Sequence, residues 1–159
     1  MGFETLEAGT TEVPQDAQST FKIISFKGSE LPANYTGVIL ARWLRSFYRL
    51  NDYFKLADPE AYFREYERFI KAIIARPNVV IKLAALSEDI DVVFGWGVSE
   101  GSVLHYVHVQ EPYRNQKMSY DLMPEHVDVI THMTKHWIKC FSKSPKNKLH
   151  HVKFNPFHY

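Results

Sequence analysis

Three consecutive segments with β-strand character constrain the fold of this chain more than any other feature. Residues 78–86 and 92–101 are rich in β-branched and aromatic residues, and the short acidic sequence SEDID separates them. This pattern is typical of a hairpin. Residues 102–110 follow directly with the same composition. We therefore expect a three-stranded antiparallel meander in the middle of the chain.

Two helices are expected before the meander. Apolar residues recur at helical spacing over residues 35–51, and three arginines, Arg42, Arg45 and Arg49, lie on a separate stripe. Asp58-Pro59-Glu60 combines an N-cap residue, a proline at the first helical position and an acidic first turn, so it predicts a second helix that ends near Arg76. Residues 21–26 precede both helices and predict a strand.

The last third of the chain predicts a short helix, a strand, a helix and a final strand. Their expected ranges are 114–123, 127–133, 134–144 and 149–154. No repeat or linker divides the chain, so we expect one domain over residues 21–159, preceded by a flexible acidic arm over residues 1–20. The fold class is α+β, with three layers in which helices flank a mixed, mainly antiparallel central sheet.

Gly95 and Gly97 stand on either side of Trp96 in the second strand of the meander. Glycine inside a strand marks a bulge or a site where another backbone comes close. We expect such a close approach here.

Charge and cysteine content indicate the surroundings of the protein. The formal net charge is only +1, so any nucleic-acid partner would need a local patch. Lysines between Lys135 and Lys153 form one candidate patch, and a solvated face is the alternative interpretation. The single Cys140 fits a reducing compartment. No apolar run approaches the ~20 residues that cross a bilayer, and no secretion signal opens the chain, so we expect a cytoplasmic protein without a membrane partner.

All eight histidines follow residue 104, which raises the question of a metal site. His105 and His108 are three apart in an expected strand and should therefore point to opposite faces. His132 and His136 have helical i, i+4 spacing, but the sequence between them lacks the glutamate of an HExxH motif and supplies no third ligand. Spacing alone thus predicts no metal site.

Residues 109–123, VQEPYRNQKMSYDLM, resemble the acyl-CoA-binding motif of the GNAT (N-acetyltransferase) superfamily. That motif has a strand-ending valine, a loop ending in Tyr-Arg, the pattern G-x-G-[IL]-G/A and two aliphatic residues. The residues in register are Val109, Tyr113, Arg114, Met118, Leu122 and Met123. The order of elements over roughly residues 20–159 also resembles this family.

A weaker likeness is to GNAT-like proteins encoded by tailed bacteriophages. It rests on Trp43-Leu44-Arg45-Ser46, on Gly95-Trp96 in the third expected strand of the chain and on Asn155-Pro156-Phe157.

The resemblance implies a site for acetyl-CoA or another acyl-CoA. Backbone N–H groups and side chains of the loop would hold the pyrophosphate, and the backbone of Val107 and Val109 would pair with the acyl-pantetheine arm. Lys117 and Ser119 stand where the family has glycine, and Lys117 could contact a phosphate directly. The implied loop residues are Arg114, Asn115, Gln116, Lys117, Met118 and Ser119.

Acyl transfer to an amine also needs a base and an acid. His105, His108 and His132 are the candidate bases, because imidazole titrates near neutral pH. Family members commonly supply the acid from a tyrosine in the helix after the fifth strand. Residues 134–144 contain no tyrosine, and Cys140 lies about where it would be. For each of these residues a purely structural role is the alternative.

Three functions follow from the sequence. The first is an acyl-CoA-dependent N-acyltransferase that acetylates an unknown amine on a small molecule or a protein. The second is a catalytically inactive GNAT-like module that binds a protein partner, encoded by a phage and acting in the host cytoplasm. The third is a nucleic-acid-modifying member of the fold.

Overall fold

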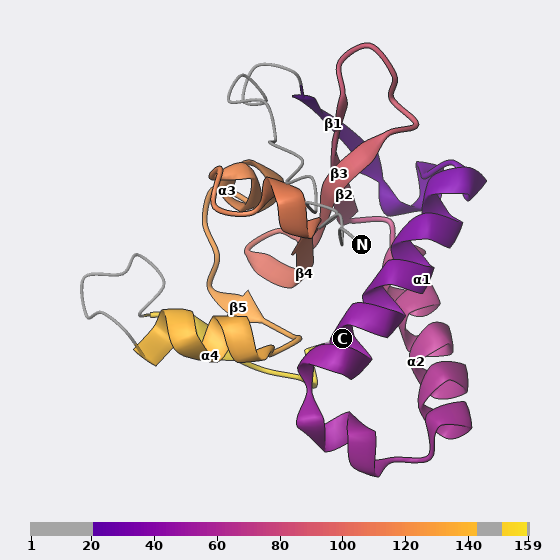
Figure 1. The fold of residues 1–159 in the computed structure, drawn as a ribbon, viewed down its shortest axis with the longest axis vertical. Helices are drawn as coiled ribbons and strands as arrows, with labels where there is room; N and C mark the ends of the chain where they lie inside the picture. Colours follow the sequence, from indigo (N-terminus) through magenta and orange to yellow (C-terminus); the bar gives the residue numbers. More distant parts are fainter. Residues whose placement is uncertain (1–20, 143–150, 159) are drawn as a thin grey trace, which may run out of the picture.

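The structure is a computed structural model that describes residues 21–142 and 151–158. Strands and helices follow one another in the predicted order (Figure 1). The strands are β1 (Phe21–Lys27), β2 (Val79–Leu86), β3 (Val93–Glu100), β4 (Val103–Val109), β5 (Val129–Ile130) and β6 (Lys153–Phe154). The helices are α1 (Ala33–Leu50), α2 (Pro59–Ile74), α3 (Met118–Leu122) and α4 (Lys135–Ser142). The expected N-terminal arm lies outside the described residues.

The six strands form one sheet in the order β1-β2-β3-β4-β5-β6. The pairs from β1 to β4 are antiparallel, whereas β4–β5 and β5–β6 are parallel. This arrangement confirms the predicted meander and the predicted α+β class with a mixed, mainly antiparallel sheet.

Helices α1 and α2 lie side by side on one face of the sheet (Figure 1). Asp58 caps α2 as predicted, because its side chain accepts a hydrogen bond from the N–H of Glu60. Aromatic residues join this layer to the sheet: Trp43 of α1 stacks on Tyr106 of β4 with ring centroids 5.1 Å apart. Within the part of the chain described, no helix is both long and apolar enough to cross a lipid bilayer.

Helix α3 covers the opposite face of the sheet, directly against the backbone of β3. A Cβ atom on Gly97 would overlap the carbonyl oxygen of Leu122 in α3, and one on Gly95 would lie 3.1 Å from the Leu122 side chain. The expectation of a close backbone approach is therefore confirmed. Lys82 of β2 reaches the end of the helix, where its Nζ donates to the carbonyl of Met123 at 3.1 Å.

Helix α3 is shorter than the predicted range 114–123, and the backbone explains both ends. Lys117 has φ of 61° in the left-handed region, which cannot belong to a right-handed helix. Met123 is extended, as expected for a residue that precedes proline. The predicted strands over 127–133 and 149–154 likewise shrink to two paired residues each, and residues 149 and 150 lie outside the described ranges.

The contact between α3 and β3 predicts a selective effect of one methyl group. Gly97→Ala should lower the free energy of unfolding by about 1–3 kcal/mol, because the added carbon forces α3 away from the sheet. Gly37→Ala is the matched control, since a Cβ there meets nothing within 4 Å. It should raise stability by about 0.5–1 kcal/mol, because alanine favours a helix. Urea unfolding measures both values, and equal effects would contradict the packing described.

Candidate functional site

The sheet opens between β4 and β5. The two strands pair only at Val103–Val129 and Leu104–Ile130, and the N–H of Thr131 bonds to the carbonyl of Leu104 at 3.2 Å. In the described part of the chain, no β5 residue pairs with β4 from Tyr106 to Val109. A cavity of about 610 Å³ lies beside this stretch of β4.

An irregularity in β4 accompanies the opening. Val98 pairs with Tyr106 but Ser99 pairs with Leu104, so His105 is an extra residue in the ladder. Its Nδ1 lies 3.0 Å from the hydroxyl of Thr131. The bulge interrupts the simple alternation of faces expected between His105 and His108 in a regular strand. Burial lowers the pKa of His105 to about 4, so the ring is neutral at neutral pH.

Most of the residues predicted to bind a cofactor line this cavity. They are Val107, Val109, Arg114, Asn115, Lys117, Met118 and Ser119. Gln116 does not line it, but its side-chain oxygen is buried without a hydrogen-bond partner among the described residues. A buried acceptor without a partner is uncommon and calls for a donor.

The loop before α3 keeps a glycine-like backbone without glycine. Asn115 and Lys117 have φ of 66° and 61°, in the left-handed region that favours glycine. Lys117 is one of the two residues that stand where the GNAT motif has glycine. Arg114 ties the loop to the end of β4, because its Nε donates to the carbonyl of Val109 at 3.1 Å.

His108 lies at the junction of this cavity with a second, smaller one of about 400 Å³, and it lines both. Its ring stacks on Trp96 with centroids 5.7 Å apart. Burial is the main cause that lowers the pKa of His108 to about 4, and the charges of Arg114, Arg42 and Arg49 add to the effect. At neutral pH the imidazole is therefore uncharged and can accept a proton.

Arginines dominate the smaller cavity, which we call the arginine groove. Arg42, Arg45 and Arg49 of α1 line it together with Arg114, and Glu111 is the one carboxylate in its wall. Like charges three or four residues apart destabilise a helix. None of these arginines forms an ion pair with a carboxylate in the described residues. An anion in the groove would relieve this repulsion.

The other two candidate catalytic residues lie elsewhere. His132 is buried in the aromatic core, 4.8 Å from Phe47 between ring centroids, and lines neither cavity. Its Nδ1 lies 2.8 Å from the hydroxyl of Thr131, and burial lowers its pKa to about 3. His132, a candidate base by sequence, therefore lies away from both cavities. Cys140 belongs to α4, but its side chain is outside the described residues.

Several cavity residues were not predicted from the sequence. Tyr106 and Leu50 contribute to the wall, as do Thr134, His136 and Trp137 at the start of α4. Their spacing carries no signal, because the return of α4 to β4 depends on long-range packing. Lys135, the first lysine of the expected basic patch, forms an ion pair with Asp52. Residues 143–150 of that patch lie outside the described ranges.

Comparisons with known proteins find similar structures. No protein-family model and no curated protein sequence matches the chain. The structure is similar to that of YjaB from Escherichia coli, with 16% identity and a TM-score of 0.43 over 64% of this chain and 60% of YjaB. It is also similar to an aminoglycoside acetyltransferase from an uncultured soil metagenomic sample, with 13% identity and a TM-score of 0.40 over 65% of this chain and 64% of that one.

A further similar structure is that of a probable acetyltransferase, with 20% identity and a TM-score of 0.38 over 64% of this chain and 65% of that one. The chain thus matches somewhat less than two thirds of the length of these proteins. Because the similarity is at this level, we infer function from the residues around the two cavities.

The position of His108 predicts a pKa that responds to one arginine and not to another. Arg49→Gln removes a positive charge that disfavours the imidazolium, so the pKa of His108 should rise from about 4. It should stay below 6.5, because burial remains. Arg45→Gln is the matched control from the same groove, since Arg45 is not among the charges that lower this pKa. NMR titration of the histidine ring measures the shift, and a wild-type pKa near 6.5 would contradict the described burial.

Proposed function

We propose that this chain is an acyl-CoA-dependent N-acyltransferase. The observation that carries the proposal is the free edge of β4 from Tyr106 to Val109: this stretch pairs with β3 but, among the described residues, not with β5, and it faces a cavity that the loop from Arg114 to Ser119 also lines. A strand edge with free backbone groups favours an extended ligand that carries amides. Few ligands combine such an arm with phosphates, and acyl-CoA is one of them.

The residues around the larger cavity fit acyl-CoA. Backbone groups of Val107 and Val109 would pair with the amides of the pantetheine arm, and the cations of Lys117 and Arg114 would face the phosphates. The unpartnered oxygen of Gln116 is buried outside the cavity wall and would accept a hydrogen bond only after the loop rearranges. When bound, acyl-CoA supplies the activated thioester.

The acceptor amine would enter through the arginine groove. Guanidinium groups bind carboxylates and phosphates in a bidentate manner, so the groove favours an acceptor that carries such a group near its amine. His108 is shared by the groove and the larger cavity and therefore lies where the acceptor would meet the thioester. The acceptor is thus proposed to be a small anionic amine.

His108 would move the proton of the reaction. The amine loses a proton as the C–N bond forms and the C–S bond breaks, and neutral His108 can accept it. An anion in the groove offsets the charges of Arg42 and Arg49 and so raises the pKa of His108, which strengthens the base when the acceptor is bound. Protonated His108 can then return the proton to the thiolate, because a thiol has a pKa near 8.5.

Isothermal titration with acetyl-CoA tests this proposal. Lys117→Gln should weaken binding about tenfold or more, because it removes a charge-assisted contact with a phosphate. Lys22→Gln on the edge strand β1 is the matched control and should bind as the wild type does. Absence of binding at millimolar acetyl-CoA would overturn the proposed acyltransferase function and favour a binding module. The replacement of the two motif glycines by Lys117 and Ser119 would then explain the loss of acyl-CoA binding.

Initial-rate kinetics with two matched amines complete the experiment. O-phosphoethanolamine should be acetylated with a lower KM than ethanolamine, and the double variant Arg45→Gln/Arg49→Gln should remove most of that preference. The KM for acetyl-CoA should not change in this variant. If the variant weakened acetyl-CoA instead, the groove would belong to the cofactor site and the proposed acceptor side would be wrong.

A further inference from the structure

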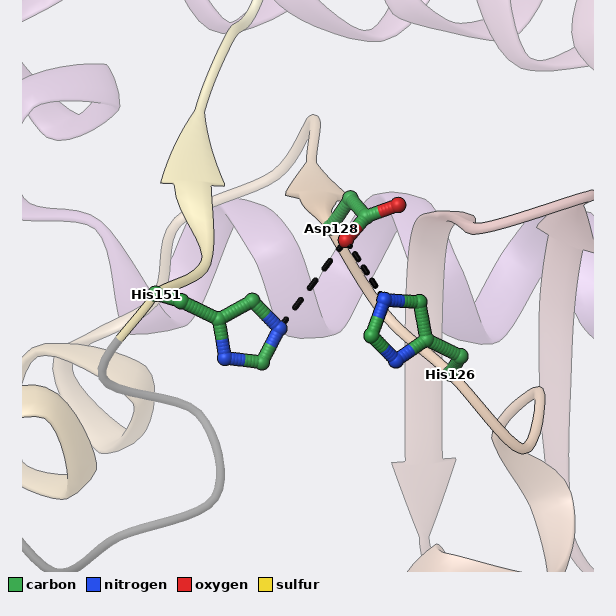
Figure 2. A group of neighbouring side chains, drawn as sticks. All are labelled: His126, Asp128 and His151. Atoms are coloured by element: carbon green, nitrogen blue, oxygen red, sulfur yellow. Dashed lines mark ion pairs between the residues drawn. The ribbon is translucent and has the colours of Figure 1, made fainter.

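Two histidines and an aspartate meet at the end of the sheet away from the cavity. His126 and Asp128 precede β5, and His151 precedes β6. The Nε2 atoms of the two histidines approach the same oxygen of Asp128, at 2.7 Å for His126 and 3.9 Å for His151. Figure 2 shows the two imidazole rings converging on this carboxylate. The rings are nearly parallel, with centroids 5.4 Å apart.

The fold holds the three residues together although they are distant in sequence. Parallel pairing of β5 with β6 places Lys153 opposite Val129. The N–H of Lys153 donates to the carbonyl of Asp128 at 2.8 Å, so His151 is held close to Asp128 in space. Ser102 holds Asp128 from the other side, because its carbonyl accepts from the N–H of Asp128 at 2.9 Å. The backbone of Asp128 is thus hydrogen-bonded on both sides.

The distances match the demands of a small divalent cation. Zinc binds imidazole nitrogen and carboxylate oxygen at about 2.0–2.2 Å in tetrahedral geometry, which places neighbouring ligand atoms about 3.3 Å apart. The observed separations of 2.7 and 3.9 Å lie on either side of that value, and all three ligand atoms lie within 4.8 Å of one another. Small side-chain rotations suffice to complete the set, because all three residues are exposed.

We propose that His126, Asp128 and His151 bind one Zn²⁺ ion, with water as the fourth ligand. The ion would fasten β6 to the sheet. Such a link has a clear structural use, because two residue pairs hold β6 to the sheet among the described residues and both of its side chains, Lys153 and Phe154, are exposed. The site lies near Val103 at the start of β4, whereas the larger cavity begins at Tyr106, so its role is separate from acyl transfer.

Isothermal titration of ZnCl₂ into the full chain, prepared without a histidine tag, tests the site. We expect one ion per chain at pH 7.5, and His126→Ala and His151→Ala should each weaken the affinity at least tenfold. His158→Ala is the matched control from the same C-terminal segment and should leave the affinity unchanged. Binding should also weaken from pH 7.5 to 5.5, because zinc needs neutral imidazoles and protonation competes with it.

A second measurement separates this site from adventitious binding to other histidines. Zn²⁺ should raise the thermal midpoint of the wild type and of His158→Ala but not of His151→Ala, and it should slow proteolysis near residue 151. The proposal is overturned if the wild type shows no saturable binding. It is equally overturned if His126→Ala and His151→Ala bind as the wild type does, or if His158→Ala weakens binding as much as they do.

Discussion

The packing of α3 on the bare backbone of β3 is the contact on which the rest of the structure depends. Gly95 and Gly97 provide the space for α3 on one face of the strand, while Trp96 between them packs against Trp43 of α1 on the other. One short sequence therefore fixes the distance of both helical layers from the sheet. It also fixes the loop before α3, which continues directly from β4 and lines the larger cavity beside that strand.

The site forms where regular sheet structure stops. The bulge at His105 and the early end of the β4–β5 pairing leave Tyr106 to Val109 paired with β3 but, among the described residues, not with β5. On that edge the backbone therefore faces a cavity instead of a neighbouring strand. Positive charge then collects on both sides of His108: Lys117 lies on the side of the larger cavity, and Arg42 and Arg49 lie on the side of the groove. The proposed chemistry needs this division, because a phosphate-bearing cofactor and an anionic acceptor must be held apart until they meet at the histidine.

Local patterns predicted the elements and their order, because hydrophobic periodicity, the Asp58 cap and the glycines around Trp96 act over a few residues. Most of the loop residues from Arg114 to Ser119 were also predicted to lie together, since they are contiguous in sequence. The length of β5, the burial of His132 and the contribution of Trp137 were not predictable, because each depends on contacts between distant segments. The late start of α3 has a local cause, the left-handed backbone of Lys117, which the side chain of lysine does not indicate. The grouping of His126 and Asp128 with His151 has the same origin, because the pairing of β5 with β6 brings together residues that the sequence analysis did not connect.

The central claim is that the unpaired edge of β4 receives acyl-CoA, and NMR mapping with ¹⁵N-labelled protein tests it most directly. Titration with acetyl-CoA should shift the amide signals of Val107 and Val109 and of residues 114–119 in a saturable way. Signals of Gly37 in α1 and of Lys22 in β1 should not move, because both lie outside the cavity walls. Saturable shifts confined to other parts of the chain, or no shifts at millimolar acetyl-CoA, would contradict the account.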